Sequence, residues 1–120
     1  MNTISIRGAI TADENSISAI SNATIELYEE IVNANNIQED DIVQIIFSLT
    51  KDLTAIYPAK ALRETFTLND TPLFCVQEAD IEGSLEKCIR ILITINSKLT
   101  KQEAKHIYLK NAKKLRPDLN

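Results

Sequence analysis

The chain contains few of the residues that several common kinds of site require. It has only 2 glycines in 120 residues, which excludes a glycine-rich phosphate-binding loop. Its single histidine and 2 cysteines show neither the spacing of a zinc site nor the pattern of a disulfide framework. The sequence also lacks a run of about 18 apolar residues and an N-terminal signal-peptide pattern. We therefore expect a cytoplasmic protein with no metal site and no membrane partner.

Length and charge narrow the class of protein further. The 120 residues, of which 44% are apolar and 25% charged, suit a single globular domain spanning residues 1–120. The net charge of −4 argues against a nucleic-acid partner, which requires a basic surface. A local cationic pocket is compatible with this charge.

The spacing of apolar residues predicts several strands. Alternating or continuous apolar stretches, many of them β-branched, predict strands over residues 3–11, 41–50, 73–77 and 88–95. The stretch 41–50 is almost continuously apolar, which is typical of a central strand covered on both faces.

Helical signals alternate with these strands. Three- and four-residue steps predict one long amphipathic helix over residues 14–34, with Asp13 as its N-cap. A proline begins a short helix over residues 58–65. A capping box between Thr100 and Glu103 predicts another short helix, which residues 107–109 either continue or follow as a brief strand. This order of elements predicts an α/β (α+β) fold with a mixed β-sheet, one long helix and short helices.

An arginine in the middle of the most apolar run is the most informative residue of the chain. Side chains alternate across a strand, so one face of the run consists of isoleucine: Ile89, Ile91, Ile93 and Ile95. Arg90 then projects from the other face, where a partly desolvated guanidinium requires an anion. The alternatives are an edge strand with Arg90 in solvent, or an ion pair between Arg90 and Glu78 or Asp80.

The cations of the chain, taken together, favour binding of a small polyanion over hydrolysis. Cations occur near the ends of predicted elements or inside strands: Arg7, Lys60, Arg63, Arg90 and Arg116. Cys75 lies in a predicted strand without an activating base, which is typical of a small hydrophobic residue rather than a nucleophile.

Six strings, in the same order and across the whole chain, resemble the monofunctional AroH-type chorismate mutases. They are Ile6-Arg7-Gly8-Ala9, Tyr57-Pro58-Ala59-Lys60-Ala61-Leu62-Arg63-Glu64, Cys75-Val76-Gln77-Glu78, Lys87-Cys88-Ile89-Arg90, His106-Ile107-Tyr108-Leu109 and Leu115-Arg116-Pro117-Asp118-Leu119. The resemblance implies a homotrimer with a pseudo-α/β-barrel core and active sites at the subunit interfaces. It also implies conversion of chorismate to prephenate for phenylalanine and tyrosine biosynthesis, without a metal or organic cofactor.

This chemistry agrees with the residues present. A one-substrate pericyclic rearrangement needs no nucleophile and no proton transfer. It needs a folded substrate and stabilisation of negative charge on the ether oxygen as the C–O bond breaks. Chorismate is a dicarboxylate, which accounts for several cations.

By position, the resemblance assigns catalytic roles to Arg90, Glu78 and Arg7. Arg90 is expected to hydrogen-bond the ether oxygen and a carboxylate, whereas Arg7 and Tyr108 are expected to bind carboxylates. Glu78 is expected to accept from the substrate hydroxyl near Cys75. Further contacts are implied for the pocket wall, from Tyr57, Ala59, Leu73 and Leu115, and for its rim, from the cations Lys60, Arg63 and Arg116.

Less specific interpretations remain open for several of these residues. Tyr108 could be a half-buried core tyrosine, Glu78 an ordinary ion-pair partner, and Arg116 a solvated tail residue. Tyr57 departs from the phenylalanine that the family commonly has there. The alternative function is a non-catalytic trimeric module that binds an anionic metabolite at its subunit interfaces.

Overall fold

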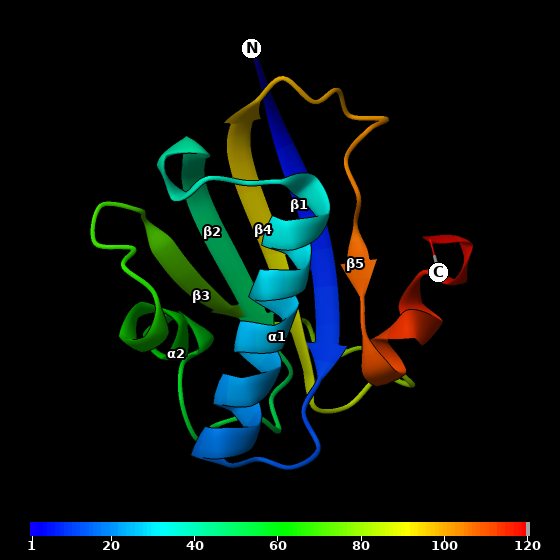
Figure 1. Ribbon diagram of the computed structural model, residues 1–120. Coiled ribbons are helices and arrows are strands. Elements are labelled where there is room, and N and C mark those ends of the chain that lie inside the picture. The colour runs from blue at the N-terminus through cyan, green and yellow to red at the C-terminus, as the bar shows by residue number, and fades with distance from the viewer. Residues whose placement is uncertain (120) are drawn as a thin grey trace.

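A five-stranded mixed sheet forms the centre of the computed structural model, which describes residues 1–119 (Figure 1). In chain order the strands are β1 (Asn2–Thr11), β2 (Ile42–Leu49), β3 (Leu73–Gln77), β4 (Cys88–Ser97) and β5 (Ile107–Tyr108). Their spatial order is β3-β2-β4-β1-β5. β4 pairs antiparallel with β1 and β2, whereas β3 and β5 add parallel to β2 and β1. The mixed sheet expected from the sequence is confirmed.

One long helix covers a single face of this sheet. α1 (Ile17–Asn35) crosses the sheet diagonally, and α2 (Pro58–Thr65) lies beside it next to β3 (Figure 1). The other helical segments are short 3-10 turns at Glu39–Asp41, Lys110–Leu115 and Pro117–Leu119. The expectation of one long helix with short helices is therefore confirmed.

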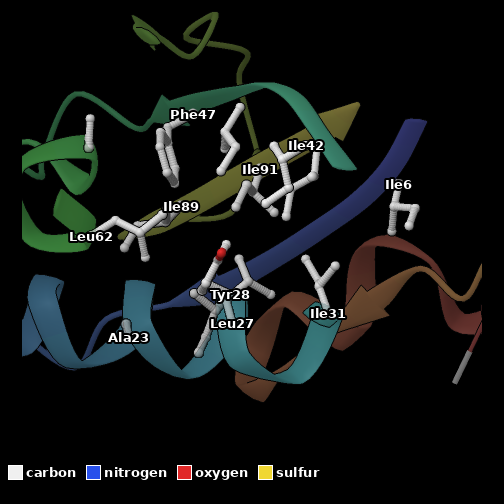
Figure 2. Packing of buried hydrophobic residues seen from close by; sticks show 14 of the residues in the cluster. Ile6, Ala23, Leu27, Tyr28, Ile31, Ile42, Phe47, Leu62, Ile89 and Ile91 are labelled. Atoms are coloured by element: carbon white, nitrogen blue, oxygen red, sulfur yellow. The ribbon is translucent and has the colours of Figure 1, made fainter. Parts of the chain in front are cut away.

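The hydrophobic core lies between α1 and the sheet. Figure 2 shows side chains of α1, including Leu27 and Ile31, meeting side chains of the strands between the two layers. The isoleucine face of β4 is fully buried there, from Ile89 at 0% exposed to Ile91 at 3%. Burial of each such side chain contributes about 1.5–3 kcal/mol, so this face fixes the orientation of β4 and directs Arg90 to the opposite side.

A glycine sets the distance between α1 and the sheet. A Cβ atom added at Gly8 of β1 would lie 2.7 Å from Cδ1 of Ile31 and 2.9 Å from the carbonyl oxygen of Ile107. Both distances are shorter than carbon atoms tolerate, so α1 and β5 can approach β1 this closely only at a residue without a side chain.

The second face of the sheet is open, which corrects the prediction of a β2 strand covered on both sides. Phe74 is 65% exposed, Val76 is 42% exposed and Val43 is 41% exposed. Ile46 and Leu92 between them are half-buried. Within residues 1–119 the apolar composition of β2 therefore exceeds what one layer of helices buries.

Two predicted helix starts are also wrong. α1 begins after Ser16, whose side chain accepts from the Ala19 N–H, and Asp13 is not its N-cap. The Thr100 N–H donates to Glu103 Oε1, but a single turn forms there instead of a helix. The Asn35 side chain binds both the N–H and the carbonyl oxygen of Lys105, which holds the following backbone extended for pairing of β5.

Candidate active site

Arg90 lies in a row of paired residues on the open face of the sheet. The strand register places Ser48 of β2, Arg90 of β4, Ala9 of β1 and Tyr108 of β5 side by side. Arg7 lies one row further along the same face. A shallow groove of about 200 Å³ is lined by Arg7, Arg90 and Tyr108. The alternation of β4 thus brings together the residues for which anion binding is expected.

An ion pair joins Arg90 to Glu78, which follows β3. Arg90 Nε lies 3.0 Å from Glu78 Oε1, and the two side chains are 44% and 30% exposed. Asp80 instead pairs with Lys51 at 2.9 Å. Of the alternatives left open by the sequence, the Glu78 pair is correct, and the edge-strand interpretation is wrong because β4 is interior.

Two further contacts fix Glu78. Its backbone N–H donates to the carbonyl oxygen of Leu49 at 2.7 Å, which extends the β2–β3 pairing past the end of β3. The Ser48 hydroxyl donates to Oε1 at 2.7 Å, the same oxygen that faces Arg90. The carboxylate is therefore anchored at its backbone and at one oxygen.

A small apolar cluster closes one end of this groove. Tyr108 is 6% exposed and packs with Ala9, Cys88 and Ala112, and Leu115 lies against them. Arg116 pairs with Asp118 at 2.8 Å. Hydrogen bonding to Asp118 raises the pKa of Arg116, and the Tyr108 hydroxyl adds to this effect. Tyr108 is thus largely a packed tyrosine, with its polar end beside the Arg116 guanidinium.

The single histidine supports the backbone of Arg7. His106 Nδ1 accepts the Arg7 N–H at 3.0 Å, which requires a neutral ring. Burial lowers the pKa of His106, and the charges of Arg7 and Arg116 lower it further. The imidazole therefore acts as a neutral hydrogen-bond acceptor at neutral pH and ties β1 to the segment before β5.

The remaining predicted residues lie elsewhere. Leu73 and Cys75 point from β3 toward the helical side and pack against the main core. Cys75 and Tyr57 line a separate groove of about 220 Å³. Burial raises the pKa of the Cys75 thiol, although Ala59 and Arg63 partly oppose the shift. A neutral thiol in this position is a wall residue and not a nucleophile.

Tyr57, which lines this second groove, is the N-cap of α2, and the helix itself carries three more of the predicted residues. Tyr57 precedes Pro58 at its N-terminus and is 68% exposed, whereas Ala59 is 5% exposed behind it. Lys60 and Arg63 lie on the exposed side of the helix, and Lys60 lines a hollow next to Tyr57. The two cations are therefore exposed on α2 and lie outside the core.

The expected site residues are thus divided between two faces of one sheet. The pairing of Cys75 with Phe47, and of Phe47 with Ile91, places Cys75 on the core side. The pairing of Val76 with Ser48, and of Ser48 with Arg90, places Arg90 on the open side. Each chain consequently carries two partial grooves.

Sequence reasoning missed two polar residues, one beside Glu78 and one at the start of β4. Ser48 is the only hydroxyl in the apolar strand Ile42–Leu49, and that isolation was a usable signal. Asp52 accepts the Lys87 N–H at 3.2 Å and 2.9 Å with its two oxygens, and the Thr50 hydroxyl also donates to it. Thr50 in turn accepts the Cys88 N–H at 3.0 Å, so Asp52 fixes the start of β4.

Residues 1–119 contain no group of three or more His, Cys, Asp or Glu side chains placed to hold a metal ion. None of the described helices has the length and hydropathy needed to cross a membrane.

Comparison with known proteins identifies the class to which this fold and these grooves belong. Residues 3–119 match the sequence model of chorismate mutase type I, and the chain belongs to this family. It is 39% identical over 115 residues to the chorismate mutase AroH of Bacillus subtilis (strain 168), covering 96% of this chain and 91% of that protein. It is 40% identical over 115 residues to the chorismate mutase AroH of Thermus thermophilus, covering 95% and 93% respectively.

A solved structure agrees with these sequence relatives. The chorismate mutase from Clostridium thermocellum superposes with a TM-score of 0.88 at 44% sequence identity, covering 92% of this chain and 97% of that one. The resemblance inferred from the six strings is confirmed.

Proposed function

We propose that this protein converts chorismate to prephenate, in phenylalanine and tyrosine biosynthesis, at sites shared between the subunits of a homotrimer. Membership of the chorismate mutase type I family supports the reaction, which is an isomerisation. The non-catalytic anion-binding module is not favoured, because the chain resembles enzymes over almost its whole length. We also propose that residues 1–120 form one domain that acts in the cytoplasm.

Arg90 carries the chemical part of this proposal. Its Nε faces Glu78, so the two ends of the guanidinium fork can donate to the ether oxygen and to a substrate carboxylate. Negative charge grows on that oxygen as the bond breaks, and a donor held on a rigid central strand stabilises it without reorganisation. Glu78 accepts from the substrate hydroxyl, and Arg7 and Tyr108 bind the carboxylates.

The division of the expected site residues between two faces of the sheet supports a site shared between subunits. In one chain, Arg90 and Cys75 belong to separate grooves, and neither groove encloses a substrate. A complete pocket requires the Arg90 groove of one subunit to face the Cys75 groove of another. The exposed apolar residues of the open face, including Phe74 and Val76, suit burial in such an interface.

The rest of the expected residues complete this pocket. Tyr57, Ala59, Leu73 and Cys75 form the wall supplied by one subunit. Leu115 and the Arg116 cation border the groove of the other. Lys60 and Arg63 lie on the exposed side of α2, where they attract the dianionic substrate and help to retain it.

Two measurements test the proposal. Purified protein should consume chorismate, followed by its absorbance, and should have the mass of a trimer in sedimentation analysis. Arg90→Ala and Ala59→Trp should each nearly abolish turnover, the first by removing the key donor and the second by filling the pocket wall.

Mixing the two inactive variants distinguishes a shared site from a local one. In co-refolded trimers, some interfaces combine an intact Arg90 groove from one chain with an intact Ala59 groove from another, so activity should reappear. Mixed trimers that form and remain inactive would show that each site lies within one chain. Wild-type protein without chorismate turnover would overturn the reaction itself.

A further inference from the structure

We infer that Ser48 is a positioning residue that holds Glu78 in the orientation needed for the substrate, an inference that rests on the proposed function. The Ser48 hydroxyl donates to Glu78 Oε1 at 2.7 Å. A hydroxyl can occupy one carboxylate oxygen and leave the other free to accept. Ser48 thereby assigns separate tasks to the two oxygens of one side chain.

The strand register makes this arrangement rigid. Ser48 of β2 is the direct partner of Arg90 in β4 and of Val76 in β3. The backbone of Glu78 is bonded to Leu49, the residue after Ser48, at 2.7 Å. Donor, carboxylate and guanidinium are therefore attached to three adjacent strands, and each distance depends on the sheet and not on a flexible loop.

Arg90 alone cannot provide the same control. Its Nε lies 3.0 Å from Oε1, the oxygen that Ser48 also binds. Without the Ser48 hydroxyl, Glu78 can rotate and bind the planar guanidinium through both oxygens, which is the preferred geometry of such pairs. That bidentate pair would occupy the N–H groups of Arg90 needed by the ether oxygen, and it would remove the acceptor for the substrate hydroxyl.

Removal of this hydroxyl should slow the reaction more than it weakens substrate binding. A hydrogen bond to a charged group has a net effect equivalent to a factor of about 10 to 100, so Ser48→Ala should lower kcat by about that factor. KM should change by less than about threefold, because the other cations still bind the carboxylates. Ser48→Thr retains a hydroxyl on a β-branched side chain suited to a strand and should restore most of the activity.

A double-mutant cycle separates positioning from an independent effect of Ser48. If the hydroxyl acts through Glu78, Ser48→Ala should cause no further loss of kcat when added to Glu78→Ala. Ser5→Ala is a matched control, since Ser5 lies on the same open face and its hydroxyl bonds Thr94 at 2.9 Å, away from Glu78. The control should keep the kcat of the wild type, and all variants should keep its urea midpoint and trimer mass.

Each result decides for or against the inference. Full kcat in Ser48→Ala, or an equal loss in the presence and absence of Glu78, would overturn it while leaving the proposed function intact. A lowered urea midpoint of Ser48→Ala, with recovery of kcat at lower temperature, would assign Ser48 a structural role only. Absence of chorismate turnover in the wild type would overturn the proposed function and this inference together.

Discussion

Replacement of Arg90 by lysine isolates the contribution of the guanidinium fork. Lysine keeps the positive charge beside Glu78 but presents one compact ammonium in place of several coplanar donors. Loss of one preorganised donor to a developing oxyanion typically costs about 3 kcal/mol, which corresponds to a reduction of kcat by roughly 10²-fold. The Arg90 side chain is 44% exposed, so its ion pair contributes at most about 1 kcal/mol to stability. Arg90→Lys should therefore lose much of its kcat with little change in the free energy of unfolding.

The assay follows the disappearance of chorismate absorbance over a range of concentrations, with urea unfolding measured on the same preparation. Arg90→Lys should lose most of kcat and retain the wild-type urea midpoint within the small cost of an exposed ion pair. Lys51→Arg is the control, because Lys51 and Asp80 form an exposed pair at 2.9 Å whose change should leave kcat unaltered. Near wild-type kcat in Arg90→Lys would refute the role of the fork.

Other substitutions probe the surrounding structure. Gly8→Ala should lower the free energy of unfolding by about 1–3 kcal/mol, measured in urea, because its Cβ would lie 2.7 Å from Ile31 Cδ1. Asp52→Ala should cost a similar amount, about 1–3 kcal/mol, since a backbone N–H and a hydroxyl lose their acceptor. Cys75→Ala should retain substantial activity at pH 7, because burial raises the pKa of the thiol and keeps it neutral. The folded-state pKa of His106 lies below its ordinary value of 6.5. The free energy of unfolding should therefore fall as the pH drops through 6.5 toward that lower pKa. This decrease should be smaller in His106→Gln.

The strand that carries Arg90 could be predicted in detail from the sequence. Four isoleucines at every second position determine both the strand and its buried face, and the arginine between them must point the other way. The partner of Arg90 could not be chosen in the same way. Glu78 and Asp80 are only two residues apart, and the choice depends on the bond from the Glu78 N–H to Leu49, which the β2–β3 pairing creates.

The capping-box signal predicted the wrong structure because a segment distant in sequence determines the backbone conformation there. The contact between Thr100 and Glu103 forms as the capping box predicts, at 2.9 Å. A helix does not follow, because Asn35 at the end of α1 binds both backbone groups of Lys105. Two such hydrogen bonds to a residue 70 positions away outweigh the weak propensity of a short polar segment. The sequence shows the capping box but not the competing hydrogen bonds between Asn35 and Lys105.

The incorrect expectation for β2 bears on the assembly of the protein. Its composition predicts cover on both faces, yet a single layer of helices, α1 and α2, covers only one face within residues 1–119. The open side presents Ile46, Phe74, Val76 and Leu92. Further along this face, Thr3 bonds Asn96 at 2.7 Å and Ser5 bonds Thr94 at 2.9 Å, so the apolar residues are concentrated at one end. That end also holds Arg90 and Glu78, which belong to an incomplete groove. A second subunit at this position would bury the apolar residues and close the groove through one contact. The exposed apolar residues and the incomplete groove of the single chain therefore both support the proposed interface.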